Sequence, residues 1–268
     1  MEERVSLRWS AHVSWLFTEH PYLERPQAAR EAGFRLVESA WPGPVEREGL
    51  PRALAEQGLS VPLLNCPAGH VAKGERGFIN DPSRAGEAER YFSEAVELAV
   101  RIGAGAVNVL AGLALPGVGE RRQRDTARAM LRALAAEAGA RGIGVVLEPL
   151  NEAENPGYLT PDPDSARRLL EAAGSENLGL LLDVYHLVRV GSDPLEAIRR
   201  HGELIRHVQI SDFPGRGQPG TGDLDLREVL SALLANGYRG AIGLEYTPLG
   251  GTAASLSFTR ASALPVSF

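Results

Sequence analysis

Residues 144–148 read GVVLE and residues 178–183 read LGLLLD, and these two runs decide the fold. Each run is apolar up to its last position, which is an acid, Glu148 in the first and Asp183 in the second. The segment between them, PDSARRLLEAA at 163–173, begins with proline and is followed by glycine, as helices often are. Strands that are apolar throughout are typical of parallel sheets covered on both faces.

The same alternation of a short apolar run and a longer amphipathic segment extends along the whole chain. Strands are expected at residues 5–9 or slightly beyond, 35–39, 61–65, 106–111, 144–148, 178–183, 206–211 and 241–246. Helices are expected at about 21–32, 45–58, 86–102, 120–141, 163–173, 194–203 and 225–236. Eight such alternations predict an α/β protein with a single (β/α)₈ TIM barrel domain over residues 1–268.

An open, doubly wound sheet is the alternative architecture. It usually has a glycine-rich phosphate-binding turn after its first strand, and the chain has no such turn there. The eighth helix is weakly indicated, because residues 247–268 predict only a short or frayed tail.

Composition restricts the class of function. The chain has 268 residues and a net charge of −6, which argues against a nucleic-acid partner, because such proteins need a basic surface. Cys66 is the only cysteine, so neither an internal disulfide nor a thiolate metal cage can form. The N-terminus lacks a signal-peptide core and no run of about 18 apolar residues occurs, so no membrane association and a cytoplasmic location are expected.

Oxygen-bearing side chains end four consecutive strands. Glu148, Asp183, Gln209 and Glu245 are separated by 35, 26 and 36 residues, each about one strand–helix unit. An unpaired buried charge costs several kcal/mol, so a shared cation is expected where these strand ends meet. Three carboxylates and an amide favour one divalent metal ion, Mg²⁺ or Mn²⁺, with Co²⁺ as a substitute. Structural ion pairs or helix N-caps are the alternative explanation of the acids.

The chain resembles the hydroxypyruvate isomerase family of xylose-isomerase-like barrels. The segments that carry the resemblance are LFTEHPYLERPQAAREAGF at 16–34, NCPAGHVAKGERG at 65–77, LEPLN at 147–151, LLDVYH at 181–186, HVQISDFPGRGQPGTGDLD at 207–225 and GLEY at 243–246. The resemblance implies that Glu148, Asp183, Gln209 and Glu245 bind the metal and that Glu148 and Glu245 are the catalytic acid/base pair. Related ketose 3-epimerases typically have His at the third ligand, so Gln209 favours hydroxypyruvate isomerase.

The expected reaction converts a small hydroxy-keto acid into its aldehyde isomer, as from hydroxypyruvate to tartronate semialdehyde. Proton transfer by Glu148 and Glu245 would pass through a metal-bound enediolate. His186 and Arg216 are expected to bind the substrate, Arg216 through a carboxylate. Lys73 and Arg76 lie in a long loop that is expected to cover the site. The alternative for these four residues is a role as solvated loop side chains.

Three other functions compete with this hypothesis. A ketose 3-epimerase or a 2-oxo-acid sugar isomerase would use the same barrel, and neutral ketoses would not require a carboxylate-binding Arg216. A barrel nuclease for abasic DNA would need several metals, many histidines and a basic groove, whereas this chain has six histidines. A barrel with a vestigial site would not need all four ligands. The resemblance is also compatible with a homo-oligomer, since dimers and larger assemblies are common in the family.

Overall fold

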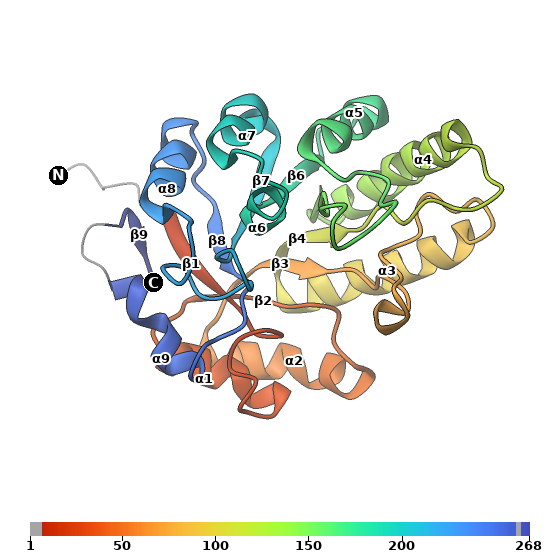
Figure 1. Ribbon diagram of the computed structural model, residues 1–268. Helices are drawn as coiled ribbons and strands as arrows, with labels where there is room; N and C mark the ends of the chain where they lie inside the picture. Colours follow the sequence, from red (N-terminus) through yellow and green to blue (C-terminus); the bar gives the residue numbers. More distant parts are fainter. Residues whose placement is uncertain (1–6, 261–263) are drawn as a thin grey trace.

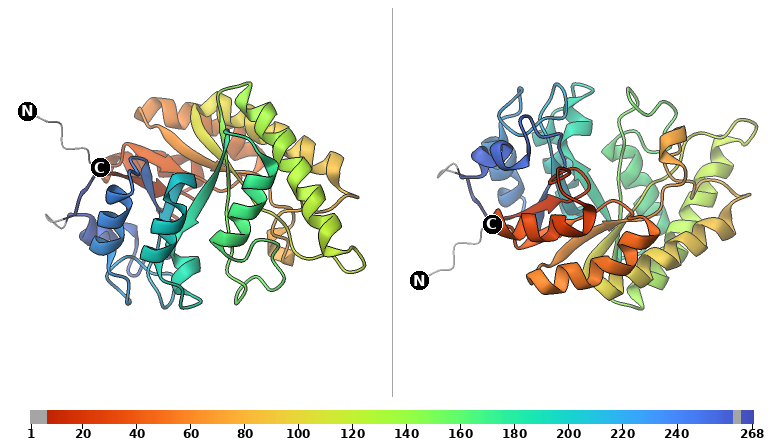
Figure 2. Two further views of the ribbon diagram at one scale, coloured as in Figure 1. Left: turned by 90° about the horizontal axis from the view of Figure 1, so that it is seen from above. Right: turned by 90° about the horizontal axis from the view of Figure 1, so that it is seen from below.

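The computed structural model describes residues 7–260 and 264–268, and it shows parallel strands arranged as a barrel inside a layer of helices (Figures 1 and 2). The barrel strands are β1 (Leu7–His12), β2 (Leu36–Glu38), β3 (Val61–Asn65), β4 (Ala104–Val109), β5 (Gly144–Leu147), β6 (Leu178–Asp183), β7 (Ile205–Ile210) and β8 (Ala241–Leu244). Neighbouring strands follow the order β2-β1-β8-β7-β6-β5-β4-β3. Parallel bridges from Leu36 to Ser60 and from Ser39 to Leu64 bring β2 beside β3 and close the barrel. The predicted (β/α)₈ barrel is confirmed.

Helices connect successive strands on the outside of the barrel. They are α1 (Arg25–Glu31), α2 (Pro44–Gln57), α3 (Ala85–Ile102), α4 (Glu120–Gly139), α5 (Pro163–Ala173), α6 (Val184–Val188), α7 (Pro194–His201), α8 (Leu226–Ala235) and α9 (Thr252–Ser255). Short 3₁₀ helices cover Tyr22–Glu24 (η1), Val71–Lys73 (η2), Gly202–Leu204 (η3) and Leu256–Arg260 (η4). Helix α5 shows why the sequence pattern was informative: the Asp162 side chain accepts from the Ser165 N–H, and Gly174 ends the helix at φ 64°. Among the described helices, none is both long enough and apolar enough to cross a bilayer.

The tail differs from the expected frayed end. Strand β9 (Val266–Ser267) pairs in parallel with the start of β1, and the Leu7 N–H donates to the Pro265 carbonyl over 3.1 Å. The Phe268 ring packs edge-on against Phe34, with 5.1 Å between the ring centroids. Residues 1–6 and 261–263 lie outside the described residues, including positions 5 and 6 of the first predicted strand.

The apolar core has two parts that together position the site. The larger part fills the space between the strands and the helices. A small cluster of Leu63, Val146 and Leu181 fills one side of the barrel interior, on β3, β5 and β6. Beyond this cluster, toward the carboxyl ends of the strands, the interior is polar, which is where barrel enzymes place their active sites.

Candidate active site

Polar side chains mark the carboxyl ends of all eight barrel strands, at the last residue of the strand, the one before it, or the one after it. They are His12, Glu38, Asn65, Asn108, Glu148, Asp183, Gln209 and Glu245. Hydrogen bonds connect neighbours around this ring: Asn108 Nδ2 donates to Asn65 Oδ1 over 3.2 Å and to Glu148 Oε2 over 2.6 Å. The four predicted metal ligands therefore come from four consecutive strand ends, β5 to β8, as the spacing indicated.

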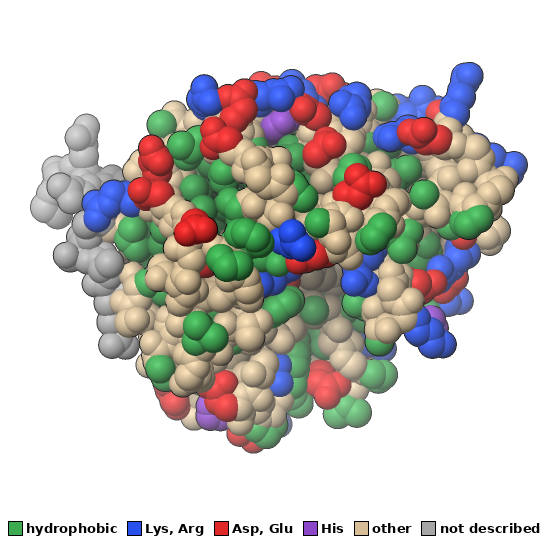
Figure 3. Space-filling model, viewed as in Figure 1, with side chains coloured by type: hydrophobic (Ala, Val, Ile, Leu, Met, Phe, Trp, Pro, Cys, Tyr) green, Lys and Arg blue, Asp and Glu red, His purple; other side chains and the backbone are tan. Residues whose placement is uncertain are grey.

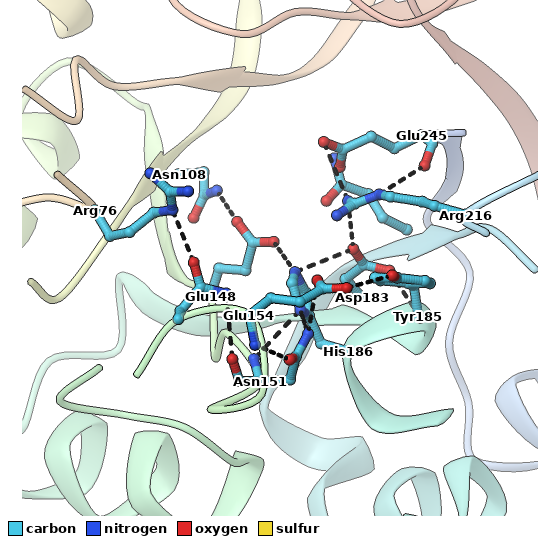
Figure 4. A network of polar contacts seen from close by, with 12 residues as sticks. Arg76, Asn108, Glu148, Asn151, Glu154, Asp183, Tyr185, His186, Arg216 and Glu245 are labelled. Carbon is cyan, nitrogen blue, oxygen red and sulfur yellow. Dashed lines mark hydrogen bonds and ion pairs between the residues drawn. The ribbon is translucent and has the colours of Figure 1, made fainter. Parts of the chain in front are cut away.

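Glu148, Asp183 and His186 form the centre of the cluster (Figure 4). Their potential ligand atoms lie within 4.8 Å of one another, and all three residues are buried. His186 Nε2 is 3.7 Å from Glu148 Oε1 and 3.6 Å from Asp183 Oδ2. His186 belongs to α6, which begins directly after β6, and this immediate helix start carries the imidazole back over the strand end.

The hydrogen bonds of His186 define which ring nitrogen carries the proton. The backbone N–H of Asn151 donates to His186 Nδ1 over 3.3 Å, and the Asn151 side-chain amide lies 2.7 Å from the same atom. That amide is oriented, because its Oδ1 accepts from the Glu154 N–H. Nδ1 is thus an acceptor, so a neutral imidazole carries its proton on Nε2. This tautomer suits a donor to a substrate oxygen better than a metal ligand, which would need the free Nε2 lone pair.

Arg216 supplies a positive charge among the acids. Its Nη2 is 2.9 Å from Asp183 Oδ2 and 3.4 Å from Glu245 Oε1, and Figure 4 shows it lying between these two carboxylates. The guanidinium also stacks over two rings, with its carbon 4.7 Å from the centroid of Trp15 and 4.8 Å from that of Tyr185. The planar cation of arginine is suited to contact both acids and aromatic faces.

The loop that carries Arg216 is held in place by Asp212, which follows β7. The buried Asp212 carboxylate accepts backbone N–H bonds from both ends of the loop, at Phe213, Gly220, Thr221, Gly222 and Leu224. Gly222 is required where the loop crosses itself, because a Cβ there would lie 2.0 Å from the Phe213 carbonyl oxygen. The FPGRGQPGTGD segment at 213–223 thus presents Arg216 from a backbone that the preceding residue, Asp212, holds in place.

Burial strongly shifts the pKa values of Glu148, Glu245 and His186. Desolvation, together with the nearby Asp183 charge, raises the pKa of Glu148 to about 7. Burial likewise raises the pKa of Glu245 well above its usual value, although Arg216 opposes this effect. Burial lowers the pKa of His186. Carboxyl groups that hold protons near neutral pH suit acid/base chemistry, and a bound cation would favour their ionised forms.

Gln209 provides a further sign that the ring suits a cation. Its Nε2 donates to Glu38 Oε1 over 2.7 Å, while its Oε1 is buried without a hydrogen-bond partner among the described residues. A buried amide oxygen without a partner is unfavourable, and a divalent metal would satisfy it. The carboxylates and this oxygen are the hard donors that Mg²⁺ and Mn²⁺ prefer, so the residues fit such an ion.

A cavity of about 570 Å³ opens above the cluster. Figure 3 shows a recess on this face of the molecule with acidic and basic side chains at its edge. The cavity is lined by Trp15, Ala40, Trp41, Asn65, Cys66, Pro67, Ala68, Gly69, Val71, Arg76, Asn108, Leu110, Glu148, Leu150, Glu154, Asn155, His186, Arg216 and Glu245. Its size and its mixture of apolar walls and a few polar groups are typical of small-molecule sites.

The loop after β3 brings one of its two predicted substrate residues to the cavity. Arg76 lines the cavity and its Nε donates to Asn155 Oδ1 over 2.8 Å. No carboxylate among the described residues lies within ion-pair distance of Arg76. Lys73 ends η2, is exposed and does not contribute to the cavity wall.

Comparison with known proteins agrees with this architecture. The model of the xylose isomerase-like TIM barrel family matches residues 26–262. The chain belongs to this family. Hydroxypyruvate isomerase from Escherichia coli is 33% identical, over 93% of this chain and 97% of the relative, and 2-oxo-tetronate isomerase from Cupriavidus necator is 33% identical, over 94% and 97%. A crystal structure from Brucella melitensis, described as an AP endonuclease of family 2, is 31% identical with a TM-score of 0.91, over 96% of this chain and 99% of that one.

These relatives confirm the resemblance to the hydroxypyruvate isomerase family, and they place this member of the xylose isomerase-like barrels among enzymes of the isomerase class. Solved ketose 3-epimerases, such as D-allulose 3-epimerase from a Methylomonas species with 22% identity and a TM-score of 0.75, share the fold.

The sequence reasoning missed one acid of the barrel. Glu38 ends β2 and is a fully buried member of the ring, where it contacts both His207 and Gln209. The signal was present, because RLVES at 35–39 is an apolar run that ends near an acid, as GVVLE does. Asn108, within AVNVLA, was missed for a different reason: a single amide in a strand has no charge to mark it.

Proposed function

We propose that this chain is a divalent-metal-dependent isomerase of a small hydroxy-keto acid, of the type that converts hydroxypyruvate to tartronate semialdehyde. Glu148 and Glu245 are its proton-transfer pair, and the metal ligands are Glu148, Asp183, Gln209 and Glu245. The observation that carries the proposal is the pair of buried glutamates with raised pKa values that both line one cavity with Arg216.

Such a pair suits the transfer of a proton between adjacent carbons. One glutamate, ionised, removes a proton from the hydroxyl-bearing carbon, and the electrons of that C–H bond form the enediolate. The other, protonated, gives a proton to the former carbonyl carbon, and the hydroxyl proton passes between the two oxygens. Because both glutamates line one cavity, one can accept a proton from the substrate while the other donates one.

The oxygens of the enediolate need a compensating charge. A bound Mg²⁺ or Mn²⁺ supplies Lewis-acid stabilisation of this charge. His186 contributes a hydrogen bond through Nε2–H, which faces the same acids. Asn108 holds Glu148 by its 2.6 Å hydrogen bond to Oε2 and leaves Oε1 toward His186.

Two arginines line the cavity and support an acidic substrate. Arg216 lies against Asp183 and Glu245, while Arg76 has only neutral partners. Figure 4 shows them on opposite sides of the acid cluster. A carboxylate would pair with either guanidinium, whereas a neutral ketose would leave Arg76 without a counter-charge.

A four-carbon 2-oxo acid is the second candidate substrate. The 2-oxo-tetronate isomerase from Cupriavidus necator is as similar to this chain as the Escherichia coli hydroxypyruvate isomerase. A cavity of about 570 Å³ also has room for a chain longer than three carbons. Ketose 3-epimerisation is supported less, because the solved epimerases share the fold at lower identity.

The name of the Brucella melitensis structure raises nuclease activity as a further alternative. The net charge of −6 does not suit a DNA surface, and the central cluster contains one histidine among its three residues. An isomerase of a small acid is therefore better supported. The cytoplasmic location and the homo-oligomer remain predictions from the sequence.

Deuterium uptake tests the proposed reaction directly. Hydroxypyruvate, a four-carbon 2-oxo acid and a panel of neutral ketoses are incubated in D₂O with the purified chain and Mg²⁺ or Mn²⁺. We expect carbon-bound deuterium in one or both acids, and none after treatment with EDTA. Labelling of the ketoses but not the acids would refute the substrate class, and labelling that survives EDTA would refute the role of the metal.

A further inference from the structure

We propose that Glu38 is a positioning residue, which orients the amide of Gln209 so that its oxygen faces the divalent cation. The inference rests on the proposed function, because it concerns the same metal site. Glu38 is not among the four proposed ligands.

Glu38 belongs to the ring, and its side chain is fully removed from solvent. Its Oε1 accepts from Gln209 Nε2 over 2.7 Å and its Oε2 lies 2.8 Å from His207 Nε2. His207 and Gln209 alternate with Val208 on β7, so both point into the barrel and meet the same carboxylate. One acid from β2 thus connects two side chains of β7 across the barrel.

Space for this carboxylate comes from a glycine on a third strand. Gly243 of β8 is the register partner of Gln209, and a Cβ at position 243 would lie 2.3 Å from Glu38 Oε1. Any larger residue would push the carboxylate away from the Gln209 amide. The glycine therefore belongs to the same arrangement as Glu38.

The chemistry of the two groups explains the orientation. An amide has a donor end and an acceptor end of nearly equal shape, so packing alone does not decide which end faces a neighbour. An ionised carboxylate only accepts, so Glu38 binds the NH₂ end of Gln209. The amide oxygen is left at the other end, buried and without a partner among the described residues, as a ligand atom would be in the absence of its metal.

The substitution E38Q isolates this effect, because it keeps the shape of the side chain and removes its acceptor-only character. Either end of the Gln209 amide can then face position 38. Mn²⁺ affinity is measured by the electron paramagnetic resonance signal of the free ion, on full-length protein whose fold is checked by circular dichroism. We expect Mn²⁺ binding about 10- to 100-fold weaker than in the unchanged chain, in the range seen when groups that orient a ligand are removed.

The double variant E38Q/Q209E provides a rescue. It reverses the hydrogen bond, because the new amide at position 38 can donate to a carboxylate at position 209, and it again leaves an oxygen for the cation. We expect the double variant to recover most of the Mn²⁺ affinity that E38Q loses. Because a carboxylate at position 209 adds ligand charge of its own, Q209E alone is the reference, and the double variant should bind Mn²⁺ more tightly than Q209E.

Two further variants serve as references. Q209A removes the proposed ligand and should weaken Mn²⁺ binding at least as much as E38Q. S10A is the matched interior control, because the buried Ser10 hydroxyl has no hydrogen-bond partner among the described residues, and it should bind Mn²⁺ as the unchanged chain does.

The outcomes separate the inference from the proposed function. Weak Mn²⁺ binding in E38Q and Q209A, with rescue in the double variant, supports the role of Glu38. Unchanged affinity in E38Q while Q209A is weakened overturns that role and leaves the proposed metal site standing. Affinity that is absent in the unchanged chain, or indifferent to Q209A, refutes the proposed site itself. If E38Q does not fold, E38D replaces it: its carboxylate is one carbon too short to reach the amide, and unchanged Mn²⁺ affinity in E38D would equally overturn the inference.

Discussion

Arg216 Nη2 lies 2.9 Å from Asp183 Oδ2, although the two residues are 33 positions apart and Asp183 ends β6 whereas Arg216 lies in the loop after β7. The guanidinium thus provides part of the positive charge that the acid cluster needs. A divalent cation at Asp183 and Glu245 would compete with Arg216 for the same oxygens. We therefore expect metal binding to weaken these ion pairs and to make Arg216 available to a substrate carboxylate.

Glu148 and Glu245 should be needed for catalysis but not for folding. We expect E148Q and E245Q each to lower kcat for hydroxypyruvate isomerisation by about 10²- to 10⁴-fold, the usual effect of losing general acid/base catalysis. Stopped assays of the product aldehyde give kcat, and circular dichroism confirms the fold. Full activity in either variant would remove that residue from the proton-transfer pair.

Arg216 should discriminate between acidic and neutral substrates. We expect R216A to raise KM for hydroxypyruvate by about 10- to 100-fold, because hydrogen bonds to charged groups contribute about 1.5–3 kcal/mol. KM for a neutral ketose, where turnover is detectable, should change much less. Parallel titrations of both substrates give the comparison. Equal effects on the two would show that Arg216 does not bind the carboxylate.

The two cations of the loop after β3 should behave differently. Arg76 lines the cavity without an acidic partner among the described residues, whereas Lys73 is exposed outside the wall. We expect R76A to raise KM for the acid and K73A to leave it within about twofold, as surface substitutions usually do. K73A is thus the matched control from the same loop. A larger effect of K73A than of R76A would mean that the loop closes over the substrate in another arrangement.

The contribution of Glu148 to stability without metal should fall as pH rises. The pKa of Glu148 is about 7 in the folded protein and near 4.5 when the group is solvated, so the folded state holds a proton that the unfolded state releases between these values. The favourable contribution is fully present below about 4.5 and is lost as pH rises through about 7. Glu245, whose pKa is also raised, acts in the same direction.

Urea unfolding in EDTA from pH 5 to pH 8 measures this effect. We expect the free energy of unfolding of the unchanged chain to decrease relative to that of E148Q across the range, because the two proteins share every other titrating group, including the buried His186. Saturating Mn²⁺ should raise it most at the upper end, because the metal binds the ionised carboxylates. A difference from E148Q that does not change with pH in EDTA would contradict the burial of a protonated Glu148.

Much of the fold could be predicted because its elements are encoded locally. The run LGLLLD at 178–183 is β6 without adjustment, and α5 occupies the predicted 163–173. The tail was the exception. Residues 247–268 have no strong periodicity, and β9 forms only because β1 offers a free edge near Leu7. Pairing of that kind depends on residues distant in the sequence, so no local sequence pattern predicts it.

The candidate site was predictable to the extent that its members share a position in a repeated unit. Glu148, Asp183, Gln209 and Glu245 fall at the ends of consecutive strands, and parallel strands of a barrel bring such ends together. Glu38 also lies at the end of a strand, and it was missed because it was not compared with the other strand-end acids. The different positions of Arg76 and Lys73 could not be predicted from the sequence, because both are cations of one loop and only the path of that loop places Arg76 on the cavity wall.

The amino-acid sequence by itself determined the barrel and the four strand-end ligand candidates, since both follow from the period of apolar residues and from the spacing between acids. Only the tertiary structure decided that Arg216 lies among those acids, that His186 presents Nε2–H, and that Glu38 binds the Gln209 amide. The physical reason is that hydrogen bonds and charge pairs act over about 3 Å, and side chains tens of residues apart reach that distance only when the barrel has closed.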